Sequence, residues 1–322
     1  MSDTVEKILS GDIRTAARLI SNIDDGVPEV KQVLKKLYPH TGKAYIIGIT
    51  GAPGVGKSTL VDRMLSHLRN QGKTAGIIAI DPTSPFSGGA LLGDRIRMQR
   101  HSNDEGVFIR SLATRGHFGG LTQSTRSTID VMDAMGKDYI IVETVGVGQD
   151  EVEIVKSAHT TVIVLIPGMG DDIQAIKAGI LEAGDIFVIN KSDREGSDNT
   201  LNDLRTMLDM DKNNDREGVW IPPILKTEAI ADKGLKTLLK EIENHRVHLA
   251  GSGDDLNLRR IRDRTRDELA EMVKSRIVQE VLTALIEDGE FDKAVESIVN
   301  GKKDPYTASD ELVQRKIKLP DQ

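Results

Sequence analysis

The chain contains no cysteine. This absence excludes disulfide bonds, thiolate catalysis, iron–sulfur clusters and zinc sites that use cysteine ligands. No run of about 18 consecutive apolar residues occurs either, which argues against a membrane-spanning helix. The N-terminal segment MSDTVEKILS lacks a basic stretch followed by an apolar one, so it does not have the pattern of a secretory signal. We therefore expect a cytoplasmic protein.

The chain also has only a small excess of acidic over basic residues. The 322 residues include 43 Lys+Arg and 50 Asp+Glu, which gives a formal net charge of −7. This mild acidity gives no reason to expect nucleic acid as the main partner. Hydrophobic residues make up 38% of the chain, enough for a core of ordinary size. The length favours two domains, or one large domain with extensions.

Two neighbouring regions differ in their hydrophobic pattern. Residues 1–43 place apolar side chains three and four positions apart, which predicts a helical N-terminal extension. In residues 44–250, short β-rich runs alternate with helical segments, and this alternation is typical of an α/β fold with a doubly wound, mostly parallel sheet. The expected strands are Tyr45–Thr50, Thr74–Ile80, Val107–Leu112, Tyr139–Glu143, Thr161–Pro167, Asp185–Asn190 and Trp220–Lys226.

Residues 251–322 lack this alternation. The segment Gly251-Ser252-Gly253 is typical of a hinge, and apolar residues with helical spacing continue from Asp254 to Glu287. A helix of that length exceeds the usual globular helix, which favours a helical dimerisation extension that packs against a second subunit. A helix that folds back on its own domain is the alternative.

One motif predicts phosphate binding. Residues 51–58 read GAPGVGKS, which matches G-x-x-x-x-G-K-[ST] between a predicted strand and a predicted helix. The glycines let successive N–H groups face a phosphate, and the N-terminus of the helix adds a positive end. Lys57 can reach the β- and γ-phosphates, and the Ser58 hydroxyl is placed for Mg²⁺. The candidate phosphate-binding residues are Gly51, Ala52, Pro53, Gly54, Val55, Gly56, Lys57, Ser58 and Thr59.

A second motif indicates which base is bound. Asn190-Lys191-Ser192-Asp193 follows an apolar strand and matches the N-K-x-D signature of guanine-binding proteins. The Asp193 carboxylate can accept hydrogen bonds from the guanine N1–H and the exocyclic amino group, whereas adenine presents neither donor there. A second base-contacting loop is expected at Thr227, Glu228 and Ala229, directly after the seventh predicted strand.

Acidic residues follow two of the predicted strands. Glu143 ends the strand that begins at Tyr139, which is the Walker-B position that contacts Mg²⁺, and the Gly146 N–H can then sense the γ-phosphate. Asp81 ends the second strand, and Asp94 lies further along the same Pro/Gly-rich stretch. Both could bring charge to a metal-bound triphosphate. A helix cap at Asp81 and a surface ion pair at Asp94 are the alternatives.

Two further Gly-rich stretches are candidates for switch regions. They are residues 114–120 and residues 168–172, and Lys177 follows the second one. Switching elements come from the less stable parts of a protein, and loops of this composition are typical of them. Plain connecting loops are the alternative for both stretches.

Together, these motifs resemble the MeaB/ArgK/MMAA family of P-loop GTPases. The resemblance covers nearly the whole chain and depends most on residues 81–95, DPTSPFSGGALLGDR. It implies a G protein that binds and hydrolyses GTP with Mg²⁺ and assists an adenosylcobalamin-dependent mutase such as methylmalonyl-CoA mutase. It also implies homodimers that form through the C-terminal helices. Glu228 departs from the family pattern, because a smaller residue is expected there.

The resemblance also assigns roles to residues. It implies a metal and γ-phosphate shell of Ser58, Asp81, Asp94 and Glu143. It implies catalytic roles for Lys57, Asp94, Glu143 and Lys177, the last within a third switch.

Two other functions compete with this one. The first is a kinase linked to lysine/arginine/ornithine transport, for which the sequence shows neither a phosphoacceptor site nor a transporter-docking surface. The second is a nickel-insertion GTPase, which would need a Cys/His cluster. Only His245 and His248 have a helical i, i+3 spacing among the seven histidines, and no cysteine is present to join them.

Overall fold

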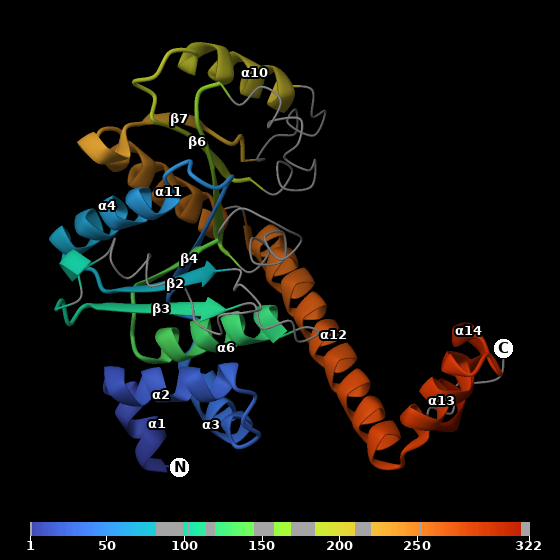
Figure 1. Cartoon of the computed structure of the whole chain (residues 1–322). Helices are drawn as coiled ribbons and strands as arrows, with labels where there is room; N and C mark the ends of the chain where they lie inside the picture. Colours follow the sequence, from blue (N-terminus) through green and yellow to red (C-terminus); the bar gives the residue numbers. More distant parts are fainter. Residues whose placement is uncertain are drawn as a thin grey trace. The chain divides into compact units, whose positions relative to one another are not determined.

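The computed structural model describes residues 2–81, 99–101, 103–113, 120–144, 158–168, 184–209, 220–251 and 253–316. The chain divides into two compact units, Met1–Ile261 and Arg262–Gln322 (Figure 1). The three-part division with boundaries near residues 43 and 250 stays a prediction.

A seven-stranded sheet forms the centre of the first unit (Figure 1). The strand order is β3-β2-β4-β1-β5-β6-β7, and every neighbouring pair is parallel. This confirms the predicted α/β fold. The strands are β1 (Tyr45–Thr50), β2 (Ala75–Asp81), β3 (Val107–Ala113), β4 (Tyr139–Glu143), β5 (Thr160–Leu165), β6 (Ile186–Asn190) and β7 (Ile224–Thr227).

The last strand is shorter than predicted. We expected it to span Trp220–Lys226, but β7 begins only at Ile224. Pro222 and Pro223 explain the difference, because proline has no N–H to donate to a neighbouring strand. The Pro223 carbonyl still accepts a hydrogen bond from the Phe187 N–H at 2.9 Å, and the Trp220 indole N–H donates to the Asp185 carbonyl at 2.8 Å.

Helices cover both faces of the sheet, so the strands are buried on both sides. Alternate residues of β1 point to opposite faces. Ile47 and Ile49 pack with α4 (Lys57–Asn70) and α11 (Leu235–Gly251), whereas Ile46 packs with α6 (Gly120–Ala134). A smaller core of β5 and β6 side chains packs against α10 (Ser197–Asp209). The continuous apolar runs that predicted the strands reflect this double burial.

The N-terminal residues form the predicted helices. They are α1 (Ser2–Leu9), α2 (Ile13–Asp24), α3 (Val30–Leu37) and a short 3₁₀ turn, η1 (Tyr38–His40). Asp12 caps α2, because its carboxylate accepts a hydrogen bond from the Thr15 N–H at 2.7 Å. These helices lie beside α6 and β3 (Figure 1), and their apolar faces share one core with α6, β2 and β3.

One buried carboxylate holds the segment that leads from these helices into β1. Asp133 of α6 accepts hydrogen bonds from the N–H groups of Gly42 at 2.5 Å and Ala44 at 2.9 Å, and it also contacts the Lys43 N–H at 3.2 Å. Its side chain is buried, so these backbone donors compensate for its desolvation. The start of β1 is therefore fixed to the helical layer.

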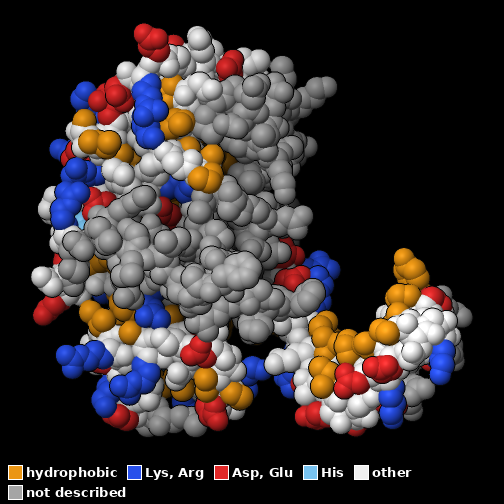
Figure 2. All heavy atoms as spheres, viewed as in Figure 1, with side chains coloured by type: hydrophobic (Ala, Val, Ile, Leu, Met, Phe, Trp, Pro, Cys, Tyr) orange, Lys and Arg blue, Asp and Glu red, His pale blue; other side chains and the backbone are white. Residues whose placement is uncertain are grey.

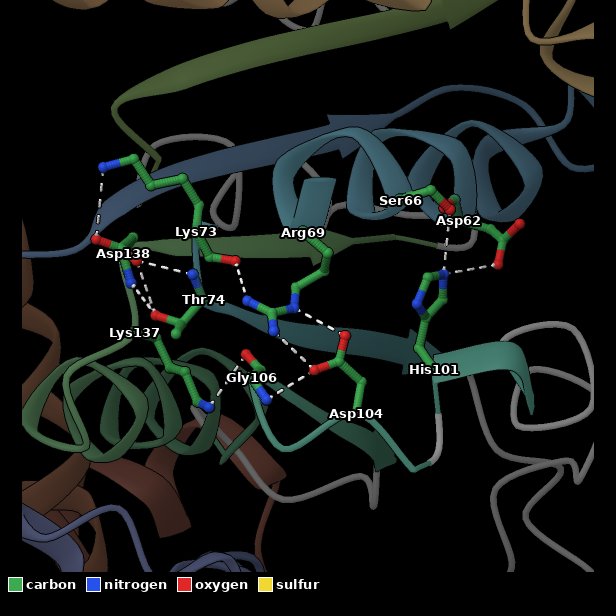
Figure 3. A network of polar contacts seen from close by, with 10 residues as sticks. All are labelled: Asp62, Ser66, Arg69, Lys73, Thr74, His101, Asp104, Gly106, Lys137 and Asp138. Carbon is green, nitrogen blue, oxygen red and sulfur yellow. Dashed lines mark hydrogen bonds and ion pairs between the residues drawn. The ribbon is translucent and has the colours of Figure 1, made fainter. Parts of the chain in front are cut away.

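Polar contacts fix α4 to the segments beside it (Figure 3). Arg69 forms a bidentate pair with Asp104, with nitrogen–oxygen distances of 2.8 and 2.9 Å. In the first half of α4, the buried Asp62 carboxylate contacts Arg100 at 2.7 Å and His101 at 3.4 Å, both from η2 (Gln99–His101). Bidentate arginine–carboxylate pairs add geometric specificity, and the two contacts join α4 to neighbouring segments near its C-terminal end and in its first half.

Three helices lie towards the C-terminus. They are α12 (Gly253–Glu287), α13 (Glu290–Val299) and α14 (Pro305–Lys316), and α12 agrees closely with the predicted long helix. Leu285 and Ala308 are buried within this region. Among the helices that the structure describes, none combines the length and apolarity needed to cross a membrane.

Candidate functional site

The GAPGVGKS segment connects β1 to α4, as predicted. Gly56 is the residue before α4, and its φ of 98° lies in the left-handed region. A Cβ atom at this position would lie 2.5 Å from the Asn190 side-chain nitrogen. Only glycine therefore satisfies both the backbone angle and the close approach of Asn190.

The Lys57 ammonium lies over the phosphate-binding loop. Its Nζ donates to the Gly51 carbonyl at 2.6 Å and the Ala52 carbonyl at 3.0 Å, and the residue is only 6% exposed. The two loop carbonyls thus hold a positive charge against the start of the loop. An ammonium in this place can bind a phosphate oxygen as a point charge.

Ser58 and Glu143 meet at the carboxyl end of the sheet. The Ser58 hydroxyl donates to Glu143 Oε1 at 2.6 Å, and both residues are buried. Their meeting follows from the topology, because β4 pairs with β1 and places Glu143 opposite Ile49, close to the start of the loop. A hydroxyl and a carboxylate are hard oxygen ligands of the kind that Mg²⁺ prefers, so the donor set fits this metal.

Asn190 joins the phosphate-binding loop to the second predicted base loop. Its side-chain nitrogen donates to the Val55 carbonyl at 2.8 Å. Its Oδ1 accepts from the Thr227 hydroxyl and from the Ala229 N–H, each at 3.1 Å. Through these three hydrogen bonds the Asn190 side chain, which is only 2% exposed, joins the end of β6 to both loops.

The rest of the N-K-x-D motif is held by the same two segments. Lys191 has a φ of 54°, and its Nζ donates to the Gly54 carbonyl at 2.7 Å. The Ser192 N–H donates to the Thr227 carbonyl at 3.1 Å. Asp193 follows directly and is exposed, so its carboxylate is available to a ligand.

The Glu228 side chain pairs with a lysine across a tight loop. Residues 228 and 233 form an antiparallel β-bridge, and the Lys233 ammonium lies 2.8 Å from the Glu228 carboxylate. The hydrogen bond that the Lys233 ammonium donates to Glu228 raises the pKa of Lys233. The turn between them contains η4 (Ala229–Ala231). The larger side chain at position 228 is thus accommodated by a nearby basic partner.

Several predicted site residues are not described. Asp81 is the last residue of β2, and only its backbone is described. Asp94, Gly146 and Lys177 lie outside the described residues, as do most of the two Gly-rich stretches. Their assignments stay predictions.

Sequence analysis did not identify three residues near the second base loop, namely Arg63, His67 and Asp232. The Arg63 guanidinium donates to the Ile230 carbonyl at 3.3 Å, and the His67 ring nitrogen lies 2.8 Å from the Asp232 carboxylate. Arg63 and His67 are four residues apart, which places them on one face of α4. That spacing was visible in the sequence, but their partners lie more than 160 residues away, at separations of 167 and 165.

Comparisons with known proteins agree with this geometry. The chain is 48% identical to a Pyrococcus abyssi protein named as a GTPase, over 98% of this chain and 97% of that protein. It is 31% identical to the GTPase ArgK of Escherichia coli, over 91% of this chain and 88% of that protein. The crystal structure of a LAO/AO transport system kinase is similar at a TM-score of 0.66 and 25% identity, covering 97% of this chain and 96% of that one.

The family comparison covers the N-terminal helices in part, the whole sheet and most of α12. Residues 16–285 match the methylmalonyl Co-A mutase-associated GTPase family, MeaB. The match includes the phosphate-binding loop, Glu143 and the N-K-x-D motif. The chain is therefore a P-loop GTPase that belongs to the MeaB family.

Proposed function

We propose that Gly51–Thr59 and Asn190–Asp193 form the two halves of a single GTP site. The observation that carries this proposal is Asn190, whose side chain bonds both the phosphate-binding loop and the Thr227–Ala229 loop. It fixes the distance between a phosphate-binding element and the Asp193 carboxylate. In this arrangement Asp193 accepts two hydrogen bonds from guanine, and Lys57 binds the β- and γ-phosphates.

The residues at the phosphate end of the proposed site can support GTP hydrolysis. Ser58 and Glu143 would hold Mg²⁺, which supplies charge neutralisation at the phosphate oxygens when it is bound. The loop N–H groups and the Lys57 ammonium stabilise the charge on the γ-phosphate as water attacks it. We further propose, from the sequence, that Asp81, Asp94, Gly146 and Lys177 complete this end of the site.

The Asp193→Asn variant tests the base half of the site. Xanthine replaces the amino group of guanine by a carbonyl, which an asparagine amide can satisfy and a carboxylate cannot. We expect GTP affinity to fall and XTP affinity to rise, each by about tenfold or more. Competition binding of GTP, XTP and ATP measures this exchange. Asp203→Asn, an exposed change on α10, is the matched control. An unchanged GTP/XTP ratio, or a wild type that prefers ATP, would contradict the site.

The description of the MeaB family supports a proposal about the protein partner. We propose that this GTPase assists an adenosylcobalamin-dependent mutase such as methylmalonyl-CoA mutase, in cofactor loading, protection or reactivation. The support is the match of residues 16–285 to a family described as methylmalonyl Co-A mutase-associated. A G protein of this kind couples its nucleotide state to the partner, so we expect slow hydrolysis alone and faster hydrolysis with the mutase. The cytoplasmic location stays a prediction from the sequence.

A binding experiment tests the partner. The full chain is immobilised with a non-hydrolysable GTP analogue and exposed to native lysate, and captured proteins are identified by mass spectrometry. We expect a cobalamin-dependent mutase, whose purified form should then accelerate GTP hydrolysis. The Asp193→Asn protein, loaded with an xanthine analogue, should capture the same mutase and is the matched control. Capture of a binding-protein transporter component would instead favour the transport-linked kinase.

The surface of α12 supports a homodimer. Exposed apolar side chains recur along α12 with helical spacing, and further ones lie on α13. Figure 2 shows hydrophobic side chains gathered on one face of the C-terminal unit. Contiguous apolar surface of this kind marks interaction sites, and we propose that a second copy of the chain covers it. These residues are Leu269, Met272, Val273, Ile277, Val278, Leu282, Ile286, Phe291, Val295 and Val299.

A further inference from the structure

Two separate sets of contacts hold the Thr227–Ala229 loop and the turn that follows it. On one side, three hydrogen bonds join it to the N-K-x-D motif: the Thr227 hydroxyl and the Ala229 N–H donate to Asn190 Oδ1, and the Ser192 N–H donates to the Thr227 carbonyl. The position of the loop therefore fixes the backbone that leads to Asp193. A shift of the loop would shift the carboxylate proposed to recognise guanine.

On the other side, the loop is tied to α4. The Arg63 guanidinium donates to the Ile230 carbonyl at 3.3 Å, and His67 lies 2.8 Å from the Asp232 carboxylate. The His67 side chain is 14% exposed and that of Asp232 is 45% exposed, so the pair is partly shielded from water.

Asp232 also has an unusual backbone. Its φ of 58° is left-handed, and it ends the 3₁₀ turn η4. Aspartate tolerates this conformation better than most side chains, but it still costs free energy relative to an extended residue. A residue held in this state by its surroundings indicates that the turn is fixed, and the contact with His67 is one means of fixing it.

These contacts close a ring. The α4 helix begins at Lys57, directly after the phosphate-binding loop, and Asn190 bonds Val55 within that loop. From Asn190 the connection runs through the Thr227–Ala229 loop and Asp232 to His67, and so back to α4. The phosphate-binding loop and the base loop are thus joined both through Asn190 and through α4.

We propose that His67 and Asp232 are positioning residues for base recognition. They hold the Thr227–Ala229 loop against α4, and the loop in turn holds Asn190 and Ser192, which set the position of Asp193. This inference rests on the proposed GTP site. It predicts that loss of the contact weakens discrimination at the base more than it changes the hydrolysis of bound GTP, because Lys57 and Ser58 lie at the opposite end of α4 from His67.

The ratio of GDP to IDP affinity measures this effect. IDP lacks only the exocyclic amino group that Asp193 is proposed to bind. For the wild type we expect GDP to bind about tenfold tighter than IDP, the range for a hydrogen bond to a charged group. In His67→Ala and in Asp232→Gly, which keeps the left-handed backbone but removes the carboxylate, that ratio should fall at least threefold. The hydrolysis rate at saturating GTP should stay within about twofold.

Conservative and control variants separate positioning from general stability. His67→Gln keeps an N–H that can reach Asp232, and Asp232→Asn keeps an acceptor oxygen and a residue that tolerates the left-handed region. Both should retain the wild-type ratio. Arg69→Ala removes a different ion pair of α4, with Asp104, so it should lower the thermal midpoint without changing the ratio.

Three results would overturn the proposal. The first is a wild-type GDP/IDP ratio in both His67→Ala and Asp232→Gly. The second is an equal fall of the ratio in Arg69→Ala, which would make the effect one of stability. The third is a wild type that does not distinguish GDP from IDP, which would overturn the base half of the GTP site as well.

Discussion

Ser58 and Glu143 are 85 residues apart in the chain, yet their oxygens lie 2.6 Å apart. Each was predicted from its own motif, and each motif follows or precedes a strand of the same parallel sheet. Because parallel strands bring their carboxyl ends to one edge, the sequence could predict that the two residues approach each other. It could not predict that their side chains share a hydrogen bond, because this depends on the register between β1 and β4.

This pair leads to a prediction about magnesium. Glu143→Gln keeps the shape of the side chain and an oxygen for the Ser58 hydroxyl but removes the negative charge. We expect Mg²⁺-dependent GTP hydrolysis to fall by about tenfold or more, the range for lost metal-site partners. GDP affinity without Mg²⁺ should stay close to wild type. Glu243→Gln on the exposed side of α11 is the control. Hydrolysis at the wild-type rate would remove Glu143 from the metal shell.

Tyr45 leads to a prediction about alkaline stability. Burial raises the pKa of its phenol to about 12, although the hydrogen bond to Thr160 lowers it. The folded pKa lies above the ordinary value, so the neutral phenol is favoured in the folded state. The stabilisation is complete below about pH 10 and is lost as the pH rises towards 12. We expect the free energy of unfolding in urea to fall across this range more steeply for the wild type than for Tyr45→Phe.

The control for this prediction is Tyr38→Phe. Tyr38 is 68% exposed, so its replacement should leave the alkaline slope of the wild type unchanged. Equal slopes for the wild type and Tyr45→Phe would contradict the assigned cause.

At the scale of elements, the sheet was the most predictable part. Six of the seven expected runs match strands to within two residues at each end, because residues buried on both faces leave an uninterrupted apolar signal. The seventh was predicted too long, since two prolines lie inside an otherwise β-rich run. The ties of α4 to its neighbours could not be predicted. They join polar residues to partners far along the chain, and no periodicity records such pairs.

One of these contacts, between Arg69 and Asp104, predicts that position 106 does not tolerate a side chain. A Cβ atom added there would lie 2.1 to 2.4 Å from the Arg69 guanidinium, which is held by Asp104 and by the Lys73 carbonyl. The guanidinium cannot move without breaking these bonds, so Gly106→Ala should destabilise the fold by about 1–3 kcal/mol. Urea unfolding measures this change.

A double mutant tests the stated cause. In an Arg69→Ala background the added methyl group meets no guanidinium, so Gly106→Ala should cost much less there than in the wild type. Gly251→Ala, where the structure places nothing near the added atom, is the control. Equal costs of Gly106→Ala in both backgrounds would mean that the clash is not the cause.

At the scale of the whole molecule, the proposed dimer would bury the exposed face of α12. Ile277→Glu places a charge within that face, where desolvation of an unpaired carboxylate opposes association. We expect light scattering to give twice the chain mass for the wild type and the single chain mass for the variant at micromolar concentration. GDP binding should be retained, because every described nucleotide-site residue precedes residue 262. Gln279→Glu is the matched control. A wild-type protein that is monomeric in this measurement would contradict the proposed dimer.

The three N–H bonds of Asp133 have a consequence for the order of events during synthesis. Gly42 and Asp133 are 91 residues apart, and the core that covers α1–α3 includes side chains of α6. At translation rates of about 5–20 residues per second, the N-terminal helices leave the ribosome roughly 5–20 s before their docking partner exists. Throughout that interval their apolar faces lack the surface that covers them in the finished protein. During that interval the apolar faces of α1–α3 are therefore accessible to chaperones that bind nascent chains.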